Sequence, residues 1–248
     1  MSTKGSGASS QGKTTPVNED AYLVRDGLGL YVVCDGASDG PAGEVAAAIA
    51  VDALERYVTS IDEGTVGRLH NALRSQSVAT EAIRAAMDAV VGAASERDEL
   101  DGMASTVSMF LTFGDRATVC HVGDSRVYLL RSGQLHLLTS DHGLTVEDAY
   151  AEATLECFSV GLLSGDTFLL CTDGAADAVE DPSVFAHIGE MSPWAAANWV
   201  VQTAHERLPD CDATAVAVRV VRTGPEPGWL WLSAQPRPFA YGHTVGPN

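Results

Sequence analysis

The chain has 248 residues, of which 46% are hydrophobic and 19% charged, so it is long enough to bury a globular core. Its net charge of −18, from 15 basic and 33 acidic residues, argues against nucleic acid as a partner, because phosphate contacts need concentrated lysine and arginine. It shows neither an apolar leader nor a long apolar run. We therefore expect a cytoplasmic protein with no membrane contact.

The cysteines are far apart and show no CxxC spacing: Cys34, Cys120, Cys157, Cys171 and Cys211. Cys34 and Cys171 lie in apolar, strand-like runs, which predicts reduced core residues of an intracellular protein.

The N-terminal residues 1–15 are rich in serine, glycine and threonine, and we expect a flexible segment ahead of a domain over 16–222. Residues 21–35 predict two strands joined by a turn at Asp26-Gly27. The second strand is apolar and ends abruptly at Asp35-Gly36. Helices are expected from near Pro41 and again within residues 66–94.

Strand signals dominate the middle of the chain, and their short connections predict antiparallel neighbours. The predicted strands are 105–113, 117–122, 126–131, 134–138, 155–162, 167–172 and 213–221. An amphipathic helix is expected over 193–207, and a loop or short helix over 143–153. The tail, 223–248, is rich in proline, glycine and aromatic residues and is expected to pack against the domain.

An Asp-Gly pair at the tip of a buried strand occurs twice, as Asp35-Gly36 and Asp173-Gly174. A strand fixes the carboxylate and glycine lets a backbone carbonyl approach, which suits a cation, although a plain Asp-Gly turn is the alternative. The candidate ligands are Asp20, Asp35 with Gly36, Asp124, Asp173 with Gly174, Asp210 and Asp212. Since no histidine or cysteine cluster has zinc spacing, a hard cation such as Mg²⁺ or Mn²⁺ is expected.

Seven segments, together covering about residues 12 to 221, resemble the metal-dependent protein serine/threonine phosphatases of the 2C type. In chain order they are NED at 18–20, VVCDGASDGPAGEVAA at 32–47, GMASTV at 102–107, HVGDSRVYLLRSGQL at 121–135, DH at 141–142, GDTFLLCTDGAAD at 165–177 and ATAVAVRV at 213–220. The resemblance implies an α+β fold, a central antiparallel β-sandwich flanked by helices in four layers. It also implies hydrolysis of phosphoserine and phosphothreonine on a partner protein by a hydroxide that bridges two Mn²⁺ or Mg²⁺ ions.

By this resemblance Asp20, Asp35, the Gly36 carbonyl and Asp173 would be metal ligands, and catalysis would depend on Asp35 and Asp173. Asp124 would lie near a third, weaker metal, whereas the alternative for its GDSR segment is a hairpin with a surface ion pair.

The sequence departs from the family pattern at several positions. The family's phosphate-binding arginine falls at Thr15, which leaves Lys13 as a candidate without bidentate geometry. Ala37 stands where some members carry a histidine proton donor, and Ser38-Asp39 where glycines are common. Aligned on Thr214, the last motif puts Cys211 at the ligand aspartate, so Asp212 or Asp210 are alternative ligands. The interval between Asp141 and Asp173 is short, which indicates a trimmed flap.

These departures motivate an alternative, a weakly active or inactive regulatory module that binds a phosphoprotein or a kinase. A phosphatase of small phosphate esters is a further alternative. The expected partner is a phosphoprotein substrate, either a serine/threonine kinase or a target of one.

Overall fold

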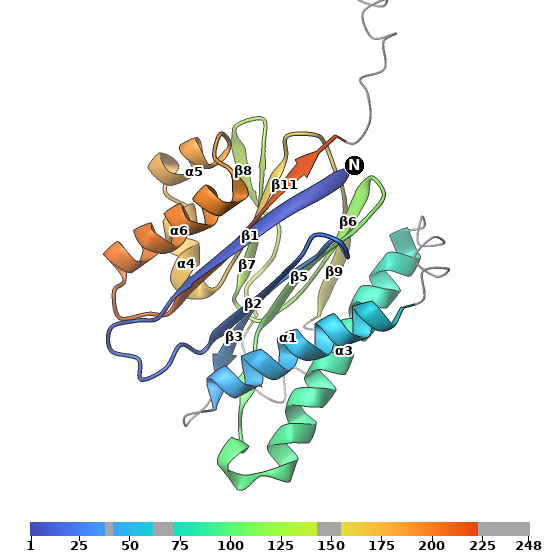
Figure 1. Ribbon diagram of the computed structural model, residues 1–248, viewed down its shortest axis with the longest axis vertical. Helices are drawn as coiled ribbons and strands as arrows, with labels where there is room; N and C mark the ends of the chain where they lie inside the picture. Colours follow the sequence, from blue (N-terminus) through green and yellow to red (C-terminus); the bar gives the residue numbers. More distant parts are fainter. Residues whose placement is uncertain (38–41, 62–71, 143–154, 223–248) are drawn as a thin grey trace, which may run out of the picture.

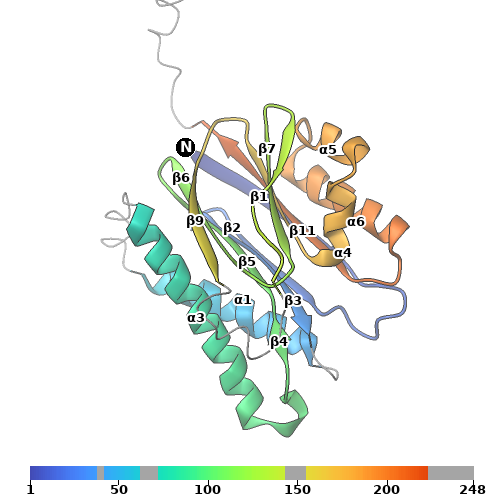
Figure 2. The same cartoon turned by 180° about the vertical axis from the view of Figure 1, so that it is seen from behind.

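The computed structural model describes residues 1–37, 42–61, 72–142 and 155–222. Two antiparallel sheets pack face to face, and helices cover the outer side of each (Figure 1). Figure 2 shows the same arrangement from behind, with α3 and α1 on one side of the sheets and α4 to α6 on the other.

The first sheet has the strand order β1 (Ser2–Ser10), β11 (Ala213–Val221), β10 (Thr167–Cys171), β7 (Arg126–Arg131) and β8 (Gln134–Leu137). The second has the order β2 (Asp20–Arg25), β3 (Leu30–Ala37), β5 (Val107–Phe113), β6 (Arg116–Val122) and β9 (Glu156–Gly161). The short strand β4 (Ala104–Ser105) pairs with the end of β3.

The helices α1 (Gly43–Ser60) and α3 (Ala72–Glu96) cover the second sheet, and a 3-10 turn, η1 (Asp98–Leu100), follows α3. The helices α4 (Asp173–Val179), α5 (Pro182–Ile188) and α6 (Pro193–Arg207) cover the first. The four layers enclose three apolar interfaces, and the expected α+β sandwich flanked by helices is confirmed.

Strand β3 shows why its sequence is apolar without interruption. Leu30, Val32 and Cys34 face the helices, whereas Tyr31 and Val33 face the other sheet, and all five are fully buried. Side chains alternate between the faces of a strand, so a strand covered on both faces has no polar position.

The expectation of a flexible N-terminus is wrong for residues 2–10. These residues form β1, which pairs with β11 along its whole length, from Ser2 opposite Val221 to Ser10 opposite Ala213. A Cβ at Gly5 would lie 2.3 Å from the Tyr31 ring, and one at Gly7 would lie 2.2 Å from the Tyr22 ring. The small residues that resemble a linker in the sequence therefore let β1 lie against aromatic rings of the second sheet.

The sequence did not predict that two of the cysteines form a pair. Cys34 and Cys171 are free and buried as expected, but Cys120 on β6 and Cys157 on β9 form a disulfide. The two partners are 37 residues apart in sequence and meet only because β6 and β9 are neighbours, so motif spacing does not reveal them.

Several expectations lie outside the described residues: those on Ser38-Asp39, on the acidic segment 143–153 and on the tail 223–248. Among the helices that the structure describes, none is long and apolar enough to cross a membrane.

Candidate metal centre

Three strand ends bring carboxylates together at one end of the sandwich. Asp20 begins β2 and lies directly opposite Asp35 of β3. Thr172, the residue after β10, donates a hydrogen bond from Oγ1 to Oδ2 of Asp20 at 2.9 Å, and Asp173 then begins α4. Asp20, Asp35 and Asp173 therefore meet, although they come from both sheets and from distant parts of the chain.

The carboxylates influence one another electrostatically. Burial raises the pKa of Asp35 to about 9, and the charges of Asp20 and Asp173 and a hydrogen bond with Asp173 add to the rise. Burial also raises the pKa of Asp20 to about 7, although hydrogen bonds from Thr214 and Thr172 oppose the rise. The pKa of Asp124 is raised by burial and by the charge of Asp173. All four carboxylates thus belong to one cluster.

The donor set fits a hard divalent cation. None of the lysine or arginine ion pairs in the described part of the chain involves Asp20, Asp35 or Asp173. One carboxylate oxygen of Glu44, in the first turn of α1, is buried and has no hydrogen-bond partner. Among the described residues, no three histidine, cysteine, aspartate or glutamate side chains are already arranged as a metal site. The cluster nevertheless offers oxygen donors with excess negative charge, which are the ligands that Mg²⁺ and Mn²⁺ prefer.

Two glycines let the start of α1 lie close to the end of β3, next to Asp35. A Cβ at Gly36 would lie 1.9 Å from the carbonyl oxygen of Gly43, and a Cβ at Gly43 would lie 2.8 Å from the Gly36 oxygen. The same added Cβ at Gly43 would lie 2.7 Å from the carboxylate carbon of Glu19. Only glycine allows the start of α1 to pass this close to the end of β3. This explains why the segment GASDGPAG begins with Gly36 and ends with Gly43.

A buried hydroxyl pair holds Asp35 in place. Thr106 Oγ1 accepts a hydrogen bond from the Asp35 amide at 2.8 Å, and the Thr106 amide donates to the Asp35 carbonyl at 2.8 Å. Ser125 Oγ lies 2.8 Å from Thr106 Oγ1, so the loop that carries Asp124 is tied to the same point. The residues predicted from the sequence did not include Thr106, Ser125, Glu19 and Glu44. The signal was present, because each lies inside a segment of the family pattern.

Asp212 in the last motif makes hydrogen bonds that the sequence did not predict, and its charge adds to the rise in the pKa of Asp20 that burial causes. Asp212 accepts hydrogen bonds from Gly12 N (2.7 Å), Thr15 Oγ1 (2.8 Å) and Glu19 N (2.8 Å). Its carboxylate thereby anchors the segment that leads into β2. Asp210 and Cys211 are exposed, and Cys211 lies beside Gly174, whose Cβ would be 3.4 Å from the Cys211 Cβ.

Of the two basic residues near the site, Arg126 forms ion pairs and Lys13 is exposed. Arg126 of the GDSR segment pairs with Asp141 at 2.7 Å and with Glu180 at 3.0 Å, as the ion-pair alternative anticipated. Asp124 nevertheless lies close enough to Asp173 for its pKa to be affected. Lys13 is exposed, and its amide donates to the Pro209 carbonyl at 2.7 Å.

Comparison with known proteins places the chain in a family. The profile of the family described as Protein phosphatase 2C matches residues 6–215. The serine/threonine protein phosphatase PstP of Mycobacterium tuberculosis (strain H37Rv) is 30% identical over 200 residues, which cover 71% of this chain and 37% of PstP. The serine/threonine phosphatase stp of Listeria monocytogenes (strain EGD-e) is 26% identical over 199 residues, which cover 69% of this chain and 77% of stp.

Solved structures agree. The catalytic domain of PstP in complex with 2 manganese ions has a TM-score of 0.76 at 25% identity and covers 89% of this chain and 99% of that one. PppA, a regulatory component of T6SS in Pseudomonas aeruginosa, has a TM-score of 0.71 at 26% identity, covering 88% and 98%. This chain spans 37% of the length of the mycobacterial relative. It belongs to the protein phosphatase 2C family.

Proposed function

We propose that this chain hydrolyses phosphoserine and phosphothreonine on a partner protein in the cytoplasm, with Mn²⁺ or Mg²⁺ as the cofactor. The observation that carries the proposal is the meeting of Asp20, Asp35 and Asp173 at the ends of three strands, where no described basic residue pairs with them. Membership of the family and the manganese ions bound by PstP support it.

In this proposal Asp20, Asp35, the Gly36 carbonyl and Asp173 hold two ions, and Asp124 contributes to a third, weaker site. The ions would supply a water nucleophile of lowered pKa and would offset the charge of the phosphoryl group. Thr172 and Thr106 orient Asp20 and Asp35 through the hydrogen bonds described above.

Substrate binding is the part in which this chain differs from its relatives. Thr15 stands where the family places an arginine, so Lys13 is proposed to contribute a point charge to phosphate binding. Asp212, Asp210 or Cys211 would complete the metal site. The proposed partner is a serine/threonine kinase or one of its phosphorylated targets.

The test is turnover of a phosphothreonine peptide and of p-nitrophenyl phosphate, each with Mn²⁺ and with a chelator. We expect hydrolysis of both with metal and of neither without it. Absence of all turnover would favour the regulatory module, and hydrolysis of the small ester alone would favour an ester phosphatase.

A further inference from the structure

We propose that Cys120 and Cys157 are a reversible thiol–disulfide site, opened and closed by exchange with a dithiol, which clamps the edge strand β9 to the rest of the second sheet. The inference concerns the fold and does not require the proposed phosphatase activity.

The position of the bond makes it a clamp. Among the strands that the structure describes, β9 is at the end of its sheet and has β6 as its one neighbour. Cys120 and Cys157 are opposite each other in the register, with their Cα atoms 4.2 Å apart. That spacing is typical of a non-hydrogen-bonded pair, in which backbone hydrogen bonds do not join the two residues directly. The disulfide therefore supplies a link at a point where the ladder itself has none.

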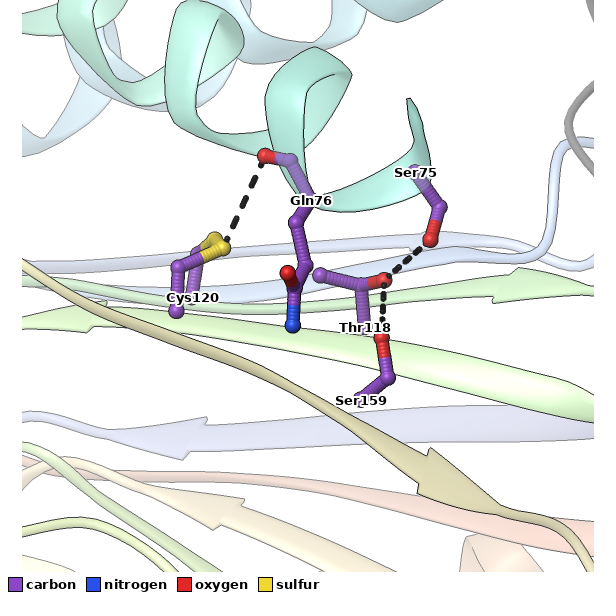
Figure 3. The surroundings of a disulfide bond; sticks show 6 residues. Ser75, Gln76, Thr118, Cys120 and Ser159 are labelled. Carbon is purple, nitrogen blue, oxygen red and sulfur yellow. Dashed lines mark hydrogen bonds between the residues drawn. A yellow bond between two sulfur atoms is a disulfide. The ribbon is translucent and has the colours of Figure 1, made fainter. Parts of the chain in front are cut away.

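The reduced form also has a place in the fold. The sulfur of Cys157 lies 3.7 Å from the carbonyl oxygen of Gln76 in α3 (Figure 3). A disulfide sulfur carries no proton, so this contact becomes a hydrogen bond only when Cys157 is a thiol. Cys120 is fully buried whereas Cys157 is partly exposed, so an incoming thiolate reaches Cys157 first. Disulfides of cytosolic proteins are commonly transient, which agrees with the proposed location.

The exchange balances without a further reactant. A thiolate of the dithiol attacks Sγ of Cys157, the bond to Cys120 breaks, and the Cys120 sulfur leaves and takes up a proton. The second thiol of the dithiol then attacks the mixed disulfide and releases Cys157. Two electrons and two protons pass from the dithiol to the cysteine pair, and the oxidised dithiol closes the bond by the reverse steps.

The clamp is connected to the candidate metal centre through Ser140. One residue beyond the disulfide, His121 lies opposite Glu156 in the register. Glu156 Oε2 accepts a hydrogen bond from the Ser140 amide at 3.0 Å, and His121 Nε2 lies 3.2 Å from the Ser140 carbonyl oxygen. A carbonyl only accepts, so Nε2 must carry the proton. Ser140 is thus held between the two strands that the disulfide joins.

The neighbour of Ser140 continues the connection. Asp141 accepts the hydrogen bonds of Arg126, which lies two residues after Asp124. Loosening of β9 at Glu156 is therefore expected to loosen residues 139–142 as well. Further along β9, hydroxyl contacts from Ser75 to Thr118 (2.8 Å) and from Thr118 to Ser159 (3.4 Å) remain after reduction (Figure 3). The loosening should be greatest at the Glu156 end.

The first experiment counts thiols in the full-length protein with a maleimide reagent after denaturation. The oxidised protein should show three, from Cys34, Cys171 and Cys211, and the reduced protein all five. Treatment of the native protein with dithiothreitol should expose the additional pair, and oxidised dithiothreitol should remove it. Five thiols after that oxidation, or a bond that resists reduction until the protein is denatured, would overturn the proposal.

The second experiment measures what the bond holds. Reduction should lower the melting temperature by roughly 5–15 °C, because the bond closes a long loop in the unfolded chain. Hydrogen exchange should rise at least about tenfold at residues 156, 158 and 139–142, but not in β10 or β11. Unchanged exchange at residues 156 and 158 upon reduction would show that the bond is no clamp.

Matched variants separate the clamp from general effects of the reductant. The single variants Cys120→Ala and Cys157→Ser should have the exchange pattern of the reduced protein and should not respond to dithiothreitol. Cys157→Ser also keeps a donor for the Gln76 carbonyl, so it guards against misfolding of the buried Cys120 variant. Cys211→Ser removes an exposed free thiol outside the disulfide, and its hydrogen exchange and melting temperature should respond to dithiothreitol as those of the wild type do. An equal response to reductant in the Cys157→Ser protein would contradict the proposal.

Discussion

The two Asp-Gly pairs at strand ends share a sequence pattern but differ in their surroundings. At Asp35-Gly36 the strand continues to Ala37, and Asp35 is partly buried beneath the start of α1. At Asp173-Gly174 the chain turns directly into α4, and Asp173 is exposed. Both glycines are required for the same reason, since a Cβ would lie 1.9 Å from the Gly43 oxygen at Gly36 and 2.1 Å from the Asp212 oxygen at Gly174.

The comparison shows why glycine follows the aspartate at both strand ends. A plain turn needs glycine for its backbone angles, but neither Gly36 nor Gly174 has a positive φ. Here glycine marks the place where a second backbone segment passes close to the strand end. The following predictions test whether the two pairs are equivalent in function and unequal in stability.

The largest expected effect is on catalysis, where the two pairs should be equivalent. Asp35→Asn and Asp173→Asn should each lower kcat/KM with Mn²⁺ by about 1,000-fold or more, because each removes a charged ligand that the substitution cannot replace. Circular dichroism should show that both proteins fold. The control is Asp115→Asn, an exposed turn residue, which should retain wild-type kcat/KM. Normal turnover by either site variant would remove that aspartate from the proposed site.

The next effect concerns the glycines. Gly36→Ala and Gly174→Ala should each lower the free energy of unfolding by about 2–3 kcal/mol, because the added methyl group would meet backbone atoms that cannot move aside freely. Gly92→Ala in α3, where no atom lies within 4 Å of the added Cβ, should instead raise stability by up to about 1 kcal/mol. Urea unfolding measures all three. Equal stability of the three variants would contradict the close approach of backbones inferred at the strand ends.

Asp212 should matter for the segment that precedes β2. Asp212→Ala leaves the amides of Gly12 and Glu19 without their acceptor and should lower the free energy of unfolding by about 2 kcal/mol. The control is Asp210→Ala, which removes an exposed carboxylate two residues earlier and should leave the free energy of unfolding almost unchanged. If Asp212→Ala is as stable as Asp210→Ala and yet binds Mn²⁺ more weakly, Asp212 is a ligand and not an anchor.

The smallest effect separates the two pairs in the metal-free protein. Asp35 is the more enclosed carboxylate and lies among Asp20, Asp173 and Asp124, so Asp35→Asn should raise metal-free stability by about 1 kcal/mol. Asp173→Asn, at an exposed position, should raise it by less than half as much. Melting curves in chelator provide the measurement. A larger gain in stability for Asp173→Asn than for Asp35→Asn would contradict the proposal that Asp35 is the more enclosed carboxylate.

Local sequence patterns predicted those parts of the structure whose cause is local. The bounds of β7, β11 and α6 agree with the predicted ranges, because the continuous apolar runs of the two strands and the Ser192-Pro193 start of the helix can be recognised along the chain. The start of α5 had the same signal, since Asp181 caps the helix before Pro182, but it was overlooked.

The features that the sequence did not predict depend on neighbours distant in the chain. β1 forms because it pairs with β11 and because its glycines leave room for aromatic rings of the second sheet. Neither the partner strand nor the rings can be inferred from residues 1–15 alone. The disulfide and the Thr106–Ser125 support likewise join strands that only the fold places together. The candidate ligands could be predicted individually, but not their convergence or the role of Asp212 as an anchor.

The central claim is that both Asp-Gly pairs hold the same metal ions. Calorimetric titration of Mn²⁺ into the wild type, Asp35→Asn and Asp173→Asn tests it without any assumption about substrate. We expect the wild type to bind two ions and either substitution to abolish high-affinity binding. Unchanged Mn²⁺ stoichiometry and affinity in either variant would contradict the account.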